Sequence, residues 1–196
     1  MKCHKCTTFA CYKGKGCKKI SEKEFKELYK DDLKLLKISS EIERDFYLKA
    51  PRIKEAIIFC KKMGFKKIGF AFCIGLKEET KKIIELFEKE NFECFSVCCK
   101  VGEFDKSHLN LKKLKENNFE AICNPALQAK ILSDLKVDIA FLIGLCMGHD
   151  VIFNKHFKGY TSTLIVKDRL LAHSPILAIY NPYMYNKVLL EEYSGK

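Results

Sequence analysis

The first third of the chain has apolar residues at helical spacing after a short polar start. Ser21 and Ser40 are each followed three residues later by glutamate, which is the spacing of a capping box and predicts that a helix begins at each serine. Pro51 opens a third apolar-periodic stretch, and Gly64 is typical of a helix end. The sequence therefore predicts a helical region over 21–64.

From residue 67 onward the pattern changes to short apolar runs that alternate with helical stretches. Strands are predicted at 68–74, 92–98, 121–123, 137–145, 163–166 and 176–180. Helices are predicted at 78–90, 109–117 and from Asn124 and Pro125 onward. Continuous apolar strands alternating with helices indicate a sheet covered on both faces. The expected fold class is α/β, an open and mostly parallel sheet with helices on both faces, three-layered and Rossmann-like.

Residues 1–20 differ from the rest of the chain because they are rich in cysteine and poor in apolar residues. A segment of this kind buries too little surface to fold by itself and needs a cross-link such as a bound metal. Its four thiols fit one zinc ion or one iron–sulfur cluster, and the alternative is four unrelated reduced thiols. The predicted metal ligands are Cys3, Cys6, Cys11 and Cys17. The expected division is a metal-binding unit at 1–20 and an α/β domain at 21–196, with its parallel sheet over 67–182.

The chain has 196 residues, 11 cysteines and a formal net charge of +11. Its lysines are scattered among glutamates rather than gathered in a basic run, so no nucleic-acid partner is expected. No apolar run approaches the roughly 18 residues of a membrane helix, and the start of the chain lacks the apolar core of a secretory signal. We therefore expect a cytoplasmic protein with reduced thiols.

Cysteines also stand where the predicted strands end. These residues are Cys73, Cys98 with Cys99, Cys123 and Cys146. Ligands of open parallel sheets bind beyond the carboxyl ends of the strands, so these thiols are expected to converge on one crevice. The sequence leaves open whether Cys98 or Cys99 faces it. The alternative is that each cysteine is a small packing residue, since free cysteine is common in protein cores.

Other polar residues fall near the same predicted edge. His149 is on the first turn of the helix that follows the cysteine at 146. Lys100, Lys167 and Arg169 follow predicted strands and are candidates for holding an anion or balancing the charge of a cluster. His173 precedes Ser-Pro and is a candidate proton carrier. We count His149, Lys167 and His173 among the candidate catalytic residues.

Four segments carry a resemblance to a known family. They are residues 69–76, 123–129, 144–150 and 166–169. Together with the cysteine-rich start of the chain, they resemble the DUF1847 family, whose members are described as uncharacterised, predicted metal-binding proteins of bacteria and archaea. The resemblance covers nearly the whole chain and implies metal binding and a cytoplasmic prokaryotic setting. It implies no particular reaction.

Three functions agree with these patterns. The first is an iron–sulfur protein, with a 4Fe–4S cluster favoured over zinc, held by Cys73, Cys99, Cys123 and Cys146 and serving a redox or sulfur-transfer partner. The second is a non-catalytic zinc carrier or sensor. The third is a thiol enzyme with a structural zinc at its N-terminus and with Cys146 and His149 as nucleophile and base. Whether the chain is an enzyme, its substrate and its oligomeric state stay open at this point.

Overall fold

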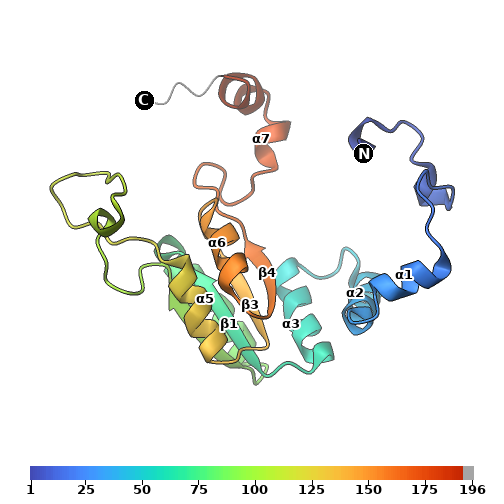
Figure 1. Ribbon diagram of the computed structural model, residues 1–196, viewed down its shortest axis with the longest axis horizontal. Helices are drawn as coiled ribbons and strands as arrows, with labels where there is room; N and C mark the ends of the chain where they lie inside the picture. Colours follow the sequence, from blue (N-terminus) through green and yellow to red (C-terminus); the bar gives the residue numbers. More distant parts are fainter. Residues whose placement is uncertain (192–196) are drawn as a thin grey trace. The chain divides into compact units, whose positions relative to one another are not determined.

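The computed structural model describes residues 1–191, and the chain divides into two compact units between Tyr47 and Leu48 (Figure 1). The first unit contains η1 (Cys3–Lys5), η2 (Ala10–Lys13), α1 (Glu22–Leu28) and α2 (Leu33–Phe46). The 3-10 turns and α1 have no buried residue. The separate cysteine-rich unit proposed for residues 1–20 stays a prediction.

The two capping boxes of the first unit have different outcomes. The hydroxyl of Ser21 accepts a hydrogen bond of 3.1 Å from the amide of Glu24, so α1 begins as predicted. No helix begins at Ser40, because α2 runs through it from Leu33 to Phe46. The buried side chains of Ile38 and Ile42 lie on both sides of Ser40 and favour one continuous amphipathic helix.

The second unit is built on a four-stranded parallel sheet of order β2-β1-β3-β4. Its strands are β1 (Lys67–Phe72), β2 (Glu93–Cys98), β3 (Ile139–Ile143) and β4 (Tyr160–Ile165). All five residues of β3 are buried, as expected for a central strand covered on both faces. This sheet confirms the predicted α/β class.

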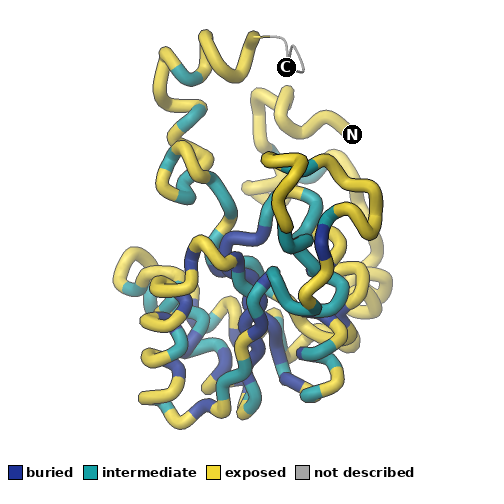
Figure 2. The backbone as a smooth tube through the Cα atoms, turned by 90° about the vertical axis from the view of Figure 1, so that its left-hand side faces the viewer, coloured by how far each residue is buried: buried dark blue, intermediate teal, exposed yellow. Residues whose placement is uncertain are grey.

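Helices cover the two faces of the sheet and complete three layers (Figure 1). One face packs on α3 (Arg52–Met63) and α4 (Lys77–Glu88), with Phe70 and Phe87 edge-to-face at the centre. The other face packs on α5 (Pro125–Asp134) and α6 (His149–His156). Figure 2 shows the buried parts of the backbone in the interior, with exposed segments around them. No helix within residues 1–191 is long and apolar enough to cross a membrane.

The segment between β2 and α5 is a loop, and the helix predicted at 109–117 is wrong. Only η4 (Lys106–Leu109) is helical there. The short strand predicted at 121–123 is reduced to a single antiparallel bridge between Ala121 and Asp105. Carboxylates of this segment bind its own backbone amides, so local hydrogen bonds compete with a regular helix.

The last predicted strand, at 176–180, is also wrong. This stretch contains α7 (Leu177–Tyr180), which is followed by the π-helical turn η5 (Met184–Leu189). Short apolar runs do not distinguish a strand from a helix, and most of this run is solvent-exposed rather than seated beside β4. The sheet therefore ends at β4.

The strand order fixes where a ligand is expected. The chain leaves β1 toward β2 on one side and returns to form β3 on the other side of β1. Such a reversal is a topological switch point, and open α/β sheets bind ligands beyond the carboxyl ends of the strands that flank it. Cys73 follows β1 directly, and Cys146 lies three residues beyond β3.

Candidate functional site

The thiol of Cys73 is paired with a cation that follows the last strand of the sheet. Lys167, just beyond β4, donates a hydrogen bond of 2.9 Å from Nζ to Cys73 Sγ. The amide of Cys73 continues the sheet by donating to the carbonyl of Ile143 at 3.0 Å, which fixes the position of the cysteine. Burial alone raises the pKa of Cys73, but the hydrogen bonds from Lys167 and from the Gly75 amide bring it below its ordinary value.

Cys99 and Cys123 form a close thiol pair. Their sulfur atoms are 3.9 Å apart, and Cys99 Sγ also accepts a bond of 3.4 Å from the amide of Ile74. The hydrogen bond between the thiols, helped by Lys100, lowers the pKa of Cys123 to about 5, and the same contact together with burial raises the pKa of Cys99. The buried Cys99 therefore keeps the proton while the half-buried Cys123 carries the charge.

A third thiol belongs to the loop after β3. Arg169 donates a hydrogen bond of 3.3 Å from its guanidinium to Cys146 Sγ, and this contact raises the pKa of Arg169. The backbone amide of His149, the first residue of α6, donates to the Cys146 carbonyl at 2.9 Å. The charge of His149 acts on Cys123, and those of Cys73 and Cys123 act on Arg169, so these groups share one neighbourhood.

His173 has a structural task in the loop that carries the two cations. Its Nδ1 lies 3.0 Å from the amide of Asp168 and 3.2 Å from the carbonyl of Val166. The carboxylate of Asp168 accepts bonds of 3.0 and 2.9 Å from the amides of Leu170 and Leu171. These contacts hold the turn that places Lys167 and Arg169, and the role of His173 as a proton carrier stays a prediction.

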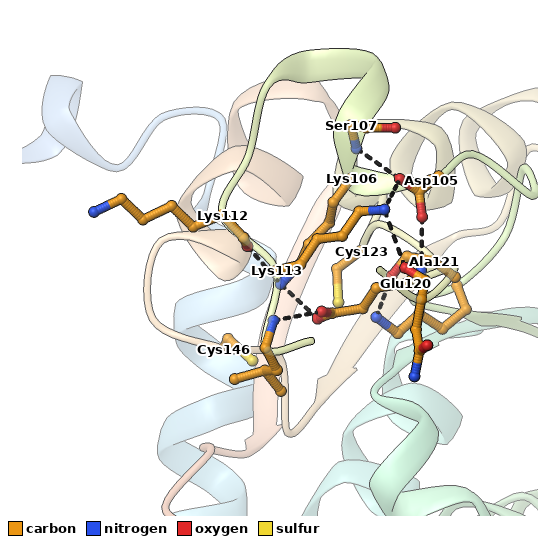
Figure 3. A network of polar contacts seen from close by, with 12 residues as sticks. Asp105, Lys106, Ser107, Lys112, Lys113, Glu120, Ala121, Cys123 and Cys146 are labelled. Atoms are coloured by element: carbon orange, nitrogen blue, oxygen red, sulfur yellow. Dashed lines mark hydrogen bonds and ion pairs between the residues drawn. The ribbon is translucent and has the colours of Figure 1, made fainter. Parts of the chain in front are cut away.

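A polar network holds the loop that leads to Cys123 (Figure 3). The buried carboxylate of Asp105 is 2.7 Å from Lys113 Nζ and accepts bonds of 2.8 and 2.6 Å from the amides of Ser107 and Glu120. Lys113 is the first of several contacts that hold the pKa of Asp105 well below its usual range. Lys100 Nζ donates to the carbonyl of Ala121 at 2.6 Å, two residues before Cys123. The network therefore fixes the loop from which the Cys123 thiol projects.

Sequence reasoning missed two supporting residues. Gln128 on α5 is fully buried and donates from Nε2 to the carbonyls of Val97 and Phe72, at 2.6 and 3.3 Å, which ties together the ends of β1 and β2. Gly144 has a φ of +60°, and a side chain there would overlap Leu76. An amide on an otherwise apolar helix face was the available signal for Gln128.

The remaining cysteines separate into packing residues and exposed residues. Burial raises the pKa of both Cys60 and Cys94 to about 12, as befits core thiols. Cys98, the last residue of β2, and Cys99 both pack in the core on the α5 side of the sheet, and it is Cys99 whose sulfur lies 3.9 Å from Cys123 Sγ. The four N-terminal cysteines are all exposed, and they are Cys3, Cys6, Cys11 and Cys17.

The donor set can be compared with the needs of a metal. Thiolates suit zinc and iron–sulfur clusters, but within residues 1–191 no three His, Cys, Asp or Glu side chains are grouped closely enough to hold a metal ion. At the carboxyl ends of the strands, called the sheet edge below, Cys73 and Cys146 instead accept hydrogen bonds from Lys167 and Arg169. This arrangement is suited to thiolate chemistry, and the cluster expected there stays a prediction.

The sequence model of a family described as "Protein of unknown function (DUF1847)" matches residues 13–164. This range includes β1 to β3, all of β4 except its last residue, and the four edge thiols, which are Cys73, Cys99, Cys123 and Cys146. The chain belongs to the DUF1847 family. It is also similar to "Uncharacterized protein MJ0455" of Methanocaldococcus jannaschii, with 46% identity over 191 residues that cover 96% of this chain and 98% of that protein. No solved structure matches the chain. The resemblance to DUF1847 is thus confirmed, and the function of this member has to be argued from its thiols.

Proposed function

We propose that this DUF1847 protein is a thiol-based redox protein whose centre is the Cys99–Cys123 pair. The observation that carries the proposal is the 3.9 Å separation of the two sulfur atoms. A disulfide needs sulfurs about 2 Å apart, so a small movement of either side chain joins them. Cys123 is half-buried and within reach of solvent, whereas Cys99 is 2% exposed, so the two thiols have different tasks.

The reaction follows from this asymmetry. The Cys123 thiolate attacks one sulfur of a substrate disulfide, and the other sulfur leaves as a thiolate with the electron pair of the broken bond. Cys99 then loses its proton and attacks Cys123 Sγ in the mixed disulfide, which releases the second substrate thiol. Two electrons pass to the substrate and the Cys99–Cys123 disulfide forms. A dithiol partner returns the pair to its reduced state by the reverse exchange.

Peptide mapping after treatment with a small disulfide tests the proposal. The wild-type chain should acquire an internal Cys99–Cys123 disulfide, and Cys99→Ser should trap the mixed disulfide on Cys123. Cys94→Ser is the matched control, because Cys94 is a half-buried thiol with a raised pKa. Mixed disulfides that gather on other cysteines, without an internal bond between residues 99 and 123, would refute the assignment.

A second proposed function is metal binding by the N-terminal cysteines. Its support is the exposure of all four thiols in a segment whose helical turns bury no residue. Such a segment lacks a core of its own, and a metal held by thiolates supplies folding free energy directly. Zinc and a 4Fe–4S cluster both accept this set, which binds after the segment rearranges to bring the ligands Cys3, Cys6, Cys11 and Cys17 together.

Metal and acid-labile sulfide content of protein purified without oxygen tests this second function. Zinc without sulfide, or iron with matching sulfide, should be lost in Cys3→Ser/Cys6→Ser and kept in the control Cys60→Ser. Iron and sulfide that persist in the first variant but vanish in Cys73→Ser/Cys146→Ser would instead locate a cluster at the sheet edge, against the dithiol assignment. A folded chain with neither metal would end the metal proposal.

A further inference from the structure

A second thiol at the carboxyl ends of the strands, Cys73, lies close to an exposed glycine. Cys73 Sγ receives its hydrogen bond of 2.9 Å from Lys167, and the neighbouring Gly75 is exposed. A methyl group added at Gly75 would meet two atoms, Lys167 Nζ at 3.9 Å and Cys73 Sγ at 4.0 Å. The missing side chain thus leaves room for a small molecule next to both the thiolate and the ammonium.

The same edge carries more than one cation for an incoming anion. Arg169 is exposed and donates to Cys146 Sγ, and the charge of Cys73 also acts on Arg169. The carboxylate of Asp168, between the two cations in sequence, is engaged by backbone amides. When Cys73 Sγ forms a bond to a second sulfur, the negative charge leaves Sγ, and Lys167 becomes free to bind another anionic group.

We propose that Cys73 accepts a sulfur atom from a small anion that carries an electrophilic sulfur, and that Lys167 and Arg169 bind the charge of that anion. The proposal rests on the proposed function in placing thiol chemistry at this edge, and it names the substrate class. A neutral disulfide would make no use of the two cations. A compact anion fits the space that Gly75 leaves and the charges that line it.

Thiosulfate illustrates the balance of the step. The Cys73 thiolate attacks the outer sulfur, a new sulfur–sulfur bond forms, and the bond inside thiosulfate breaks. Sulfite leaves with the electron pair of that bond, and Cys73 carries a persulfide. No external oxidant or reductant is consumed. Lys167, no longer paired with a free thiolate, neutralises the persulfide or the leaving sulfite.

The experiment incubates the reduced full-length protein with thiosulfate without oxygen and measures released sulfite. Alkylation and peptide mass spectrometry then locate the added sulfur. We expect one sulfite per chain and one extra sulfur atom on the Cys73 peptide, both lost in Cys73→Ser. Lys167→Met should slow the reaction about tenfold or more, since a hydrogen bond to a charged group is lost. Lys167→Arg should restore most of the rate, and Lys130→Met, on exposed α5 surface, is the control.

The need for a residue without a side chain next to Cys73 is tested at Gly75. Gly75→Ala should react nearly as wild type because the methyl meets only ordinary contact distances, whereas Gly75→Leu should slow sulfite release at least about tenfold without unfolding the protein, checked by circular dichroism. Sulfur found on another cysteine, or no sulfite from folded wild-type protein, would overturn the proposal. A Cys73 adduct in a chain whose Cys99–Cys123 disulfide never forms would refute the proposed function alone.

Discussion

Cys99 Sγ lies 3.9 Å from Cys123 Sγ, although 24 residues separate the two cysteines in the sequence. Cys99 directly follows β2 and Cys123 precedes α5, and the amide of Asn124 donates to the Cys99 carbonyl at 2.7 Å to close the loop between them. This backbone hydrogen bond thus holds the two cysteines close together at the base of a long loop. Its chemistry can be tested without knowledge of the substrate.

Alkylation at mildly acidic pH should distinguish Cys123 from the core thiols. Its pKa is lowered to about 5, so its thiolate is present at pH 6 and disappears as the pH falls through 5. Cys60 and Cys94, with pKa values raised to about 12, stay protonated at pH 6. We expect iodoacetamide to label Cys123 at least about a hundredfold faster than either, as read by peptide mass spectrometry. Equal labelling of the three in folded protein would contradict this.

Removal of the Lys100 charge should move the alkylation profile of Cys123 to higher pH. Lys100 lowers the pKa of Cys123 by a hydrogen bond and by its charge. In Lys100→Met we expect the midpoint of the rate–pH curve to rise by roughly one unit. Lys130→Met, which removes a lysine paired with Asp134 on the surface, should leave the midpoint in place. The same midpoint in the wild type and both variants would mean that Lys100 only stabilises the loop, through its bond to the Ala121 carbonyl, and does not act on the Cys123 thiol.

Replacement of Gln128 should destabilise the fold, because this side chain links the ends of β1 and β2 next to the thiols. Gln128→Met loses the hydrogen bonds to the carbonyls of Val97 and Phe72 and should cost about 1–3 kcal/mol in urea unfolding. Gln128→Glu places a carboxyl against the same carbonyls, so burial favours its protonated form and raises its folded pKa. Its stability should therefore increase as the pH falls toward 5, unlike that of Gln128→Met. If the stabilities of the two variants changed with pH in the same way, the side chain at position 128 would not be held against these two carbonyls.

Two glycines allow backbone strain to be separated from steric overlap. Gly148 has a φ of +86° with open space around it, whereas Gly144 has a φ of +60° and lies against Leu76. Gly148→Ala should cost about 1–2 kcal/mol from the backbone alone. Gly144→Ala should cost more by about 1–3 kcal/mol, and Leu76→Ala in the same chain should recover part of that excess in a double-mutant cycle. Equal costs at both glycines would exclude the overlap.

The sequence was sufficient to predict the strands that position the site. Runs such as 137–145 are long, apolar and bounded by helices, so their type and parallel pairing follow from burial alone. Because parallel strands end at one edge, the meeting of Cys73 with Cys99 and Cys123 could be expected before the structure was seen. Their partners could not be predicted, since the Lys167–Cys73 contact spans 94 residues and depends on the register of three strands.

The errors occurred where local signals were weak. Residues 109–117 have apolar residues near helical spacing, but the carboxylates of Asp105 and Glu120 bind backbone amides in the same loop and override that preference. Residues 176–180 form an apolar run too short to distinguish strand from helix. The metal expected from the spacing of the N-terminal cysteines and from the cysteines at strand ends stays a prediction, since sequence spacing does not distinguish a thiol paired with a cation from a thiol that binds a metal.

The placement of Lys167 and Arg169 after the last strand has a consequence for biosynthesis. All four edge thiols leave the ribosome before the cations that Cys73 and Cys146 require, because residues 73, 99, 123 and 146 precede 167 and 169. Until β4 docks, a nascent chain has no ammonium at Cys73, so this thiol lacks the hydrogen bond from Lys167 that lowers its pKa. The effect of Lys167 on Cys73 therefore begins only after the last strand of the sheet has been translated and has joined its neighbours.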